Sequence, residues 1–171
     1  MKVLVYGAGV IGCFLAHTLC EAGQEVTLLA RGAWRKALET NGLVIRHSLQ
    51  KKNTVNHPRI VEEAGDEQYD AAFAVMQHQQ MAEALPKLAE IHTTLLICVG
   101  KNMSAFWMER EILSLAKQAK QEKKVLFGFQ GTGGRRENGR VECVRFGDGS
   151  MSLGGLHGEV DAETKERIGA L

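Results

Sequence analysis

Three glycines near the start of the chain have a spacing that suits phosphate binding. Gly7, Gly9 and Gly12 form the pattern G-x-G-x-x-G directly after a short apolar run. In this context the first glycine allows a tight turn, the second lets a pyrophosphate approach the backbone, and the third lets a helix pack closely on a sheet. Free N–H groups and the dipole at the helix start attract the phosphate charge. We therefore predict that a dinucleotide binds to Gly7, Ala8, Gly9, Val10, Ile11 and Gly12; the alternative is a turn that binds nothing.

The residues after the second expected strand indicate which dinucleotide fits. Proteins that bind NAD place an acidic residue there, which accepts hydrogen bonds from the adenosine ribose. This chain has Leu29-Ala30-Arg31-Gly32, without a carboxylate, and Arg31 is well placed to pair with a 2′-phosphate. Arg35 and Lys36 could add positive charge one turn later. The pattern favours NADP(H), and the alternative for Arg31 is a solvated surface residue.

The elements that position these residues alternate between strands and helices. Buried strands are expected at residues 2–6, 25–29, 70–76, 94–99 and 125–129, and helices at 10–21, 33–40, 79–89, 104–120 and 161–171. Further strands are expected at 43–46 and 54–61, and residues 141–146 and 151–156 are expected to pair after a Gly-rich loop. This order predicts an α/β fold: a doubly wound, mainly parallel Rossmann sheet with a late antiparallel hairpin at one edge.

Length, composition and charge limit the class of protein. The chain has 171 residues, 44% of them hydrophobic, and a formal net charge of +1, which gives no electrostatic case for nucleic acid or an anionic membrane as partner. No apolar stretch reaches the roughly 20 residues of a membrane span, and the start does not look like a signal peptide. We expect a cytoplasmic protein with four reduced cysteines and, since no His or Cys residues have ligand spacing, no metal.

Several segments together resemble the N-terminal domain of the 2-dehydropantoate 2-reductase (ketopantoate reductase) family. They are residues 1–12; Leu29-Ala30-Arg31-Gly32, then Ala37-Leu38 and Asn41-Gly42-Leu43; Leu95-Leu96-Ile97 with Gly100; residues 125–134 with Arg135-Arg136 and Gly139; and Met151-Ser152-Leu153-Gly154. The resemblance runs over nearly all of the chain. It implies that NADPH reduces the ketone of a 2-keto acid: hydride passes from the nicotinamide to the carbonyl carbon, and a lysine protonates the developing alkoxide.

The resemblance also implies further cofactor contacts, at Met76, Gln77, Gln80, Val99, Gly100 and Gly134. Two of these positions depart from the family. A lysine is usual near the nicotinamide ribose where this chain has Gln77, and an Asn-Gly turn is usual where it has Val99-Gly100. A glutamine side chain can donate a hydrogen bond but carries no charge. A valine side chain carries no charge and forms no hydrogen bond. We therefore expect dinucleotide binding to survive better than catalysis.

No residue of the chain can be assigned the family's catalytic roles, which a second, helical domain supplies. We expect residues 1–171 to form the dinucleotide-binding domain alone, from a truncated chain, because residues 161–171 are helical yet end without a cap. His78 is a weak catalytic candidate, and the alternative is a surface histidine in the first turn of a helix. Phe106 and Trp107 are expected in the core or against a second domain. Arg135-Arg136 could approach a phosphate or lie on a hairpin surface.

Three functions follow as alternatives. The leading hypothesis is an NADPH-dependent oxidoreductase that reduces a small-molecule 2-keto acid and is inactive as this chain alone. The second is a catalytically silent NADP(H)-binding module or sensor, which the departures at Gln77 and Val99 favour. The third is a fragment of an opine-type dehydrogenase, which shares the N-terminal fold. A homodimer is an open alternative for the oligomeric state.

Overall fold

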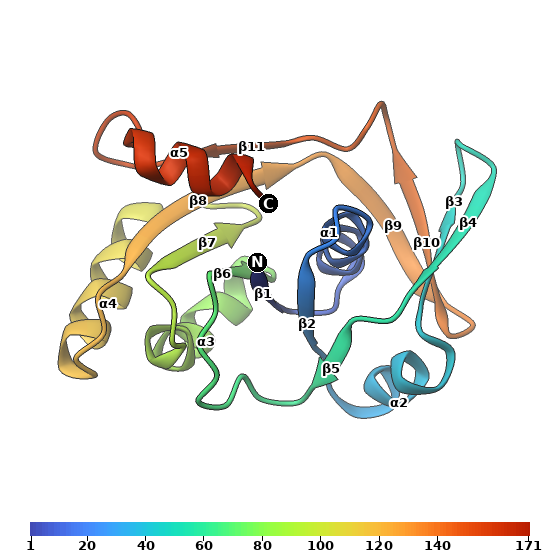
Figure 1. Cartoon of the computed structure of the whole chain (residues 1–171), viewed down its shortest axis with the longest axis horizontal. Helices are drawn as coiled ribbons and strands as arrows, with labels where there is room; N and C mark the ends of the chain where they lie inside the picture. Colours follow the sequence, from blue (N-terminus) through green and yellow to red (C-terminus); the bar gives the residue numbers. More distant parts are fainter.

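A seven-stranded sheet forms the centre of the molecule (Figure 1). The computed structural model describes all residues from 1 to 171. In spatial order the strands are β11 Met151–Gly154, β8 Lys124–Gln130, β7 Leu95–Val99, β6 Ala71–Val75, β1 Lys2–Tyr6, β2 Glu25–Leu29 and β5 Arg59–Val61. All neighbours pair in parallel except β11, which runs antiparallel to β8. The predicted doubly wound, mainly parallel fold is confirmed.

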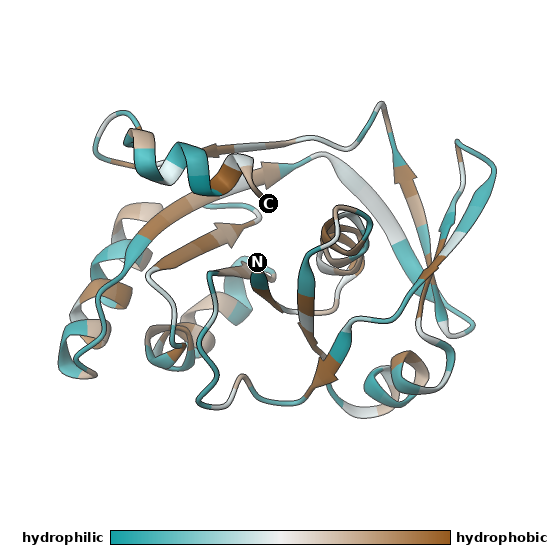
Figure 2. Cartoon of the chain, viewed as in Figure 1, coloured by the Kyte–Doolittle hydropathy of each residue, from teal (hydrophilic) through white to brown (hydrophobic).

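The central strands are buried on both faces, as their continuous apolar runs predict. Every residue of β6 and β7 is buried. Because successive side chains of a strand point to opposite faces, Val3 and Val5 enter the core beneath helix α1 (Val10–Glu21), whereas Leu4 and Tyr6 enter the opposite core. Helices α3 (His78–Glu90) and α4 (Ala105–Gln118) cover that second face. Figure 2 shows the apolar residues gathered along the strands of this sheet.

A second sheet packs on the outer side of α1. Its strands are β4 Lys52–Asn56, β3 Leu43–His47, β10 Arg140–Arg145 and β9 Thr132–Glu137, in that spatial order. Helix α1 contacts all four strands and also β1 and β2, so it lies between the two sheets (Figure 1). This position explains why most of the helix is buried, from Gly12 to His17 and again at Leu19. The sequence did not predict this sheet as a separate layer.

Residues 54–61 do not form one strand, contrary to expectation. They contribute to β4, which pairs antiparallel with β3, and to β5, which pairs parallel with β2. His57 and Pro58 separate the two strands. Proline has no N–H to donate to a ladder and its φ is fixed, so the chain leaves one sheet there and enters the other.

The predicted pairing of residues 141–146 with 151–156 is wrong. β10 pairs antiparallel with β9 and parallel with β3, and β11 pairs with β8 at the edge of the main sheet. The Gly-rich stretch expected as a loop is strand β9. Asn138 and Gly139 connect β9 to β10 with φ values of 50° and 74°, as the favoured two-residue hairpin turn requires. The hairpin of this region therefore joins β9 to β10 through Asn138-Gly139, and residues 141–146 and 151–156 are not its two strands.

Two further helices complete the fold. Helix α2 (Gly32–Asn41) follows β2 and contacts β3 and β5. Helix α5 (Ala162–Gly169) begins at Asp161, whose carboxylate accepts a hydrogen bond from the Thr164 N–H at 3.0 Å. Ile168 and Leu171 then pack against the core on the α1 side of the main sheet.

Candidate dinucleotide-binding site

A cleft of about 1200 Å³ opens at the carboxyl ends of the parallel strands. The chain reverses its direction of winding beside β1, because β2 lies on one side of it and β6 on the other. Ligands of doubly wound sheets bind at such a switch point. The lining comes from residues 6–12, 29–31, 75–80, 99–101, 129–130, 132–134 and 136, among others. Every cofactor contact predicted from the sequence lies in this lining, and so does His78.

The three glycines of the first loop differ in what surrounds them. Gly7 has a φ of +122°, and a Cβ there would lie 2.2 Å from the Val75 carbonyl oxygen. A Cβ at Gly12 would lie 1.8 Å from the Gly7 carbonyl oxygen, because the helix begins directly against the loop. Gly9 has no atom within 4 Å of the equivalent position. Two glycines therefore allow close backbone packing, and Gly9 leaves open space on the cleft side.

The start of α1 presents unpaired backbone donors beside that open space. The first hydrogen bond of the helix runs from the Cys13 N–H to the Gly9 carbonyl, at 2.9 Å. The N–H groups of Val10, Ile11 and Gly12 therefore have no partner within the helix. No side chain caps this end, and its first turn contains no acidic residue. Three donors and the positive end of the helix dipole are thus free to hold an anion.

Arg31 lies at the other side of the loop, at the end of β2. Its Nη2 donates to the Tyr6 hydroxyl at 3.2 Å, and it forms no ion pair. Arg35, in contrast, pairs with Glu39 at 2.8 Å and Glu62 at 2.7 Å, outside the cleft. The expectation that Arg35 and Lys36 add charge to this site is therefore wrong. Arg35 is neutralised by two carboxylates, and Lys36 does not line the cleft.

Gln77 and Gln80 cap helix α3 at the next strand end. The Gln80 Oε1 accepts a hydrogen bond from the Gln77 N–H at 3.3 Å, and the Gln77 side chain in turn accepts from the Gln80 N–H. The Gln79 Nε2 also donates to the Gln77 Oε1, at 2.6 Å. This reciprocal cap satisfies backbone donors of the first turn. Gln77 therefore caps helix α3, a structural role that its sequence position did not indicate.

Val99 and Gly100 form the floor of the cleft beside Met76. Val99 is buried, whereas Met76 and Gly100 are half-buried. Gly100 has a φ of +149°, and a Cβ there would lie 3.0 Å from the Met76 carbonyl oxygen. Gly134 has a φ of +144°, and a Cβ there would lie 2.0 Å from the Glu142 carbonyl oxygen. The glycine at 134 is thus required for the β9–β10 pairing as well as lining the cleft.

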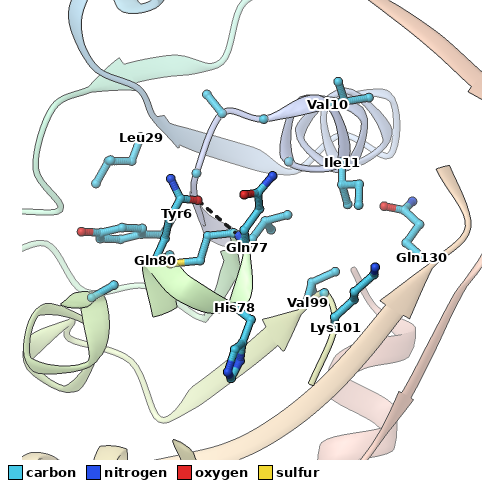
Figure 3. Close-up of a pocket in the computed structure, with 18 of the residues that line it drawn as sticks. Tyr6, Val10, Ile11, Leu29, Gln77, His78, Gln80, Val99, Lys101 and Gln130 are labelled. Carbon is cyan, nitrogen blue, oxygen red and sulfur yellow. Dashed lines mark hydrogen bonds between the residues drawn. The ribbon is translucent and has the colours of Figure 1, made fainter. Parts of the chain in front are cut away.

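Lys101 is a lining residue that the sequence analysis missed. Its side chain is exposed and forms no ion pair or hydrogen bond with the protein. Figure 3 shows it pointing into the cleft toward Ile11 and Gln130, whereas the His78 ring points away from them. The signal that could have found it is its place, directly after the carboxyl end of the buried strand β7. Charged residues at that edge face the ligand site of such sheets.

Of Arg135 and Arg136, for which a phosphate contact and a hairpin surface were both open, only Arg136 lines the cleft, whereas Arg135 pairs with Glu137. The Arg136 Nη1 donates to the Ala8 carbonyl at 3.4 Å, and its guanidinium carbon lies 5.4 Å from the centroid of the Trp34 ring. The lining thus contains four cations, Arg31, Lys87, Lys101 and Arg136, against a single carboxylate, Glu83. Such an excess of positive charge raises the local concentration of an anionic ligand.

The cysteines and histidines are the remaining side chains that could act as a nucleophile or bind a metal. All four cysteines are free thiols, as expected. Burial raises the pKa of Cys13 and of Cys98 to about 12, so both stay protonated at neutral pH. No group of three or more His, Cys, Asp or Glu residues is placed to hold a metal ion. No helix has the length and apolar character needed to cross a membrane.

Comparisons with known proteins agree with this geometry. The family model described as ketopantoate reductase PanE/ApbA matches residues 3–158. A 2-dehydropantoate 2-reductase of Mesorhizobium japonicum is 33% identical over 146 residues, which are 84% of this chain and 38% of that protein.

Solved structures with the same fold include two classes of enzyme. The 2-dehydropantoate 2-reductase from Methylococcus capsulatus gives a TM-score of 0.74 at 21% identity, covering 99% of this chain and 53% of that one. A D-mandelate dehydrogenase, solved with NADH and anilino(oxo)acetate, gives a TM-score of 0.74 at 20% identity. The match covers 99% of this chain and 54% of that one. The chain therefore spans about half the length of these structures, and less of the curated relative. With the family model matched over nearly its whole length, the chain belongs to the ketopantoate reductase PanE/ApbA family.

Proposed function

We propose that this domain binds NADP(H) and serves an oxidoreductase that reduces a 2-keto acid. The observation that carries the proposal is the open space at Gly9, faced by the unpaired amides of α1. A side chain at this position would fill the space through which a pyrophosphate approaches. The residues present therefore suit a dinucleotide. The amides of Val10, Ile11 and Gly12 would hold its pyrophosphate.

The adenosine end of the cleft favours the cofactor with a 2′-phosphate. A D-mandelate dehydrogenase of this fold was solved with NADH, so the fold by itself does not select between the two cofactors. In this chain no carboxylate stands at the end of β2, where an NAD-binding protein needs one. Arg31 has free donors there and no acidic partner. A guanidinium matches the geometry of a phosphate through paired hydrogen bonds.

The opposite end of the cleft would hold the keto acid. NADPH supplies a hydride when bound, and negative charge then develops on the ketone oxygen, which a cationic donor stabilises. Lys101 is the unpaired cation at this end and would attract the carboxylate of the substrate. Gln77 and Val99 provide no charge. Since the His78 ring points away from the glycine loop, His78 would have to change rotamer before donating a proton.

A catalytically silent NADP(H)-binding module is the second candidate. The observation that favours it is the engagement of Gln77 in the cap of α3, at the position where the resemblance implies a lysine near the nicotinamide ribose. Such a protein would bind the cofactor without turning it over.

Calorimetric titration with NADPH and NADH tests cofactor binding. We expect NADPH to bind at least about tenfold more tightly than NADH, since a charged hydrogen bond contributes about 1.5–3 kcal/mol. Arg31→Ala should remove most of that preference. Arg35→Ala is the matched control, because Arg35 is already neutralised by Glu39 and Glu62. If folded protein binds neither cofactor, the proposal is wrong.

Turnover separates the candidate functions. NADPH oxidation is followed at steady state with a panel of 2-keto acids, with and without an added amino acid. Reduction of a 2-keto acid alone supports the leading proposal, and turnover only when the amino acid is present supports an opine-type dehydrogenase. Tight NADPH binding without turnover supports the silent module.

A further inference from the structure

Arg136 connects three parts of the molecule that are distant in the sequence. It belongs to β9 of the second sheet, yet it lines the cleft of the main sheet. Its Nη1 donates to the carbonyl of Ala8, in the glycine loop, at 3.4 Å. Its guanidinium lies over the ring of Trp34, in the first turn of α2, with 5.4 Å between the guanidinium carbon and the ring centroid. The side chain is thus held between the loop and the helix that border the adenosine end.

The charge of Arg136 is not compensated by the protein. Arg135 pairs with Glu137 at 2.9 Å, and Arg140 pairs with Glu142 at 2.8 Å. Successive side chains of a strand point to opposite faces, so Glu137 lies on the same face as Arg135 and opposite to Arg136. Arg136 forms no ion pair, and the Ala8 carbonyl takes only one of its five N–H donors. An exposed cation with free donors therefore lies at the Ala8 carbonyl, next in sequence to Gly9.

We propose that Arg136 is a second phosphate-binding residue of the dinucleotide site, acting from the second sheet. The inference rests on the proposed function, because the phosphate is one of the cofactor's. Stacking on an indole favours a guanidinium and fixes its plane, so the Trp34 ring pre-orients the donors. The contact with Ala8 places them near the pyrophosphate, and the contact with Trp34 places them near the 2′-phosphate that Arg31 faces. Either phosphate offers the same chemistry to the guanidinium.

The test compares Arg136→Gln with Arg135→Gln by calorimetric titration. Both positions are exposed and lie on the same strand, but only Arg136 faces the cleft. We expect Arg136→Gln to weaken NADPH binding about tenfold or more, as expected for the loss of a charged hydrogen bond. Arg135→Gln should change it less than about twofold, because surface ion pairs contribute little. Thermal unfolding of both variants checks that they remain folded. An Arg136→Lys variant, which keeps the positive charge but lacks the planar guanidinium group, is a further folded control.

Titration with NADH, ADP and adenosine 2′,5′-bisphosphate identifies the phosphate. Equal losses for NADPH and NADH assign Arg136 to the pyrophosphate. A loss confined to NADPH and adenosine 2′,5′-bisphosphate assigns it to the 2′-phosphate. If Arg136→Gln binds every ligand as tightly as wild type while Arg31→Ala weakens NADPH, only this inference fails. If the wild-type protein binds no nucleotide, the proposed function fails, and this inference with it.

Discussion

At the scale of single residues, the three glycines of the loop at residues 7–12 differ in what their missing side chains allow. Gly7 and Gly12 permit contacts between backbone segments, with β6 and with the loop itself. Gly9 touches nothing and leaves space for a ligand. We therefore expect a substitution at Gly12 to act on folding and a substitution at Gly9 to act on ligand binding. The motif alone does not separate these effects, because all three positions carry the same residue type.

Gly9→Val should abolish NADPH binding without unfolding the protein. The added side chain enters open space on the cleft side, but Gly9 is the N-cap of α1, where valine is less favourable than glycine, so the free energy of unfolding should fall by about 1 kcal/mol. Gly12→Ala is the contrasting variant. Its Cβ would meet the Gly7 carbonyl oxygen at 1.8 Å, and overpacking of this kind costs about 1–3 kcal/mol. Urea unfolding and calorimetry measure both effects, and a Gly9→Val protein that binds NADPH normally would contradict the assignment of the loop.

At the scale of elements, the contact between α1 and the second sheet contains two buried histidines. His17 of α1 and His47 of β3 have ring centroids 5.2 Å apart. The His17 Nδ1 is hydrogen-bonded to the Asn56 Oδ1 at 2.5 Å, and the His47 Nε2 to the Thr54 hydroxyl at 2.8 Å. The His47 Nδ1 is buried without a partner. Burial, with a smaller contribution from the charge of His17, lowers the pKa of His47 to about 4.

This contact should weaken as the pH falls. His47 is neutral in the native protein, whereas the unfolded chain takes up a proton near pH 6.5. Neutral His47 therefore contributes its full share to the free energy of unfolding above about pH 6.5. This share decreases as the pH falls from 6.5 to about 4, and it stays constant below pH 4. The loss should be about 2–3 kcal/mol. Urea unfolding of wild type and His47→Gln between pH 7.5 and 4.5 measures it: the difference between the two proteins should shrink with falling pH, and parallel curves would refute the prediction.

At the scale of the whole molecule, the cleft is assembled from segments between Tyr6 and Arg136, in both sheets. A cofactor that contacts all of them binds only the folded chain and stabilises it. At a concentration one hundred times its Kd, NADPH should add about 2.7 kcal/mol to the free energy of unfolding and raise the Tm by roughly 5–10 °C. NADH at the same concentration should give a smaller increase. Thermal unfolding followed by circular dichroism provides the measurement, and an unchanged Tm with NADPH would argue against cofactor binding.

An exposed apolar surface borders the same cleft. Met103 and Phe129 line it, and Phe106 and Trp107 follow Met103 in the sequence; their exposed fractions are 84%, 63%, 68% and 40%, respectively. The alternative that Phe106 and Trp107 belong to the core is therefore wrong. Their contact with a second domain stays a prediction.

The sequence by itself determined the parts of the protein whose information is local. The apolar runs of β1, β2, β6 and β7 specify buried strands without reference to their neighbours, and the alternation with helices then restricts the sheet to parallel, doubly wound arrangements. The glycine loop is equally local, because its turn, its open position and its helix start lie within residues 7–12.

Only the tertiary structure decided which distant segments meet. β10 pairs with β3 across roughly one hundred residues of chain, and no local pattern specifies that partner, because any half-buried strand can join such an edge. The same long-range pairing brings Arg136 to Ala8, while the folding of β5 beside β2 brings Glu62 to Arg35 and neutralises it. These spatial neighbours determine whether a charged side chain is free to bind a ligand or is paired with a carboxylate. Local sequence does not specify such neighbours, because they come from distant parts of the chain.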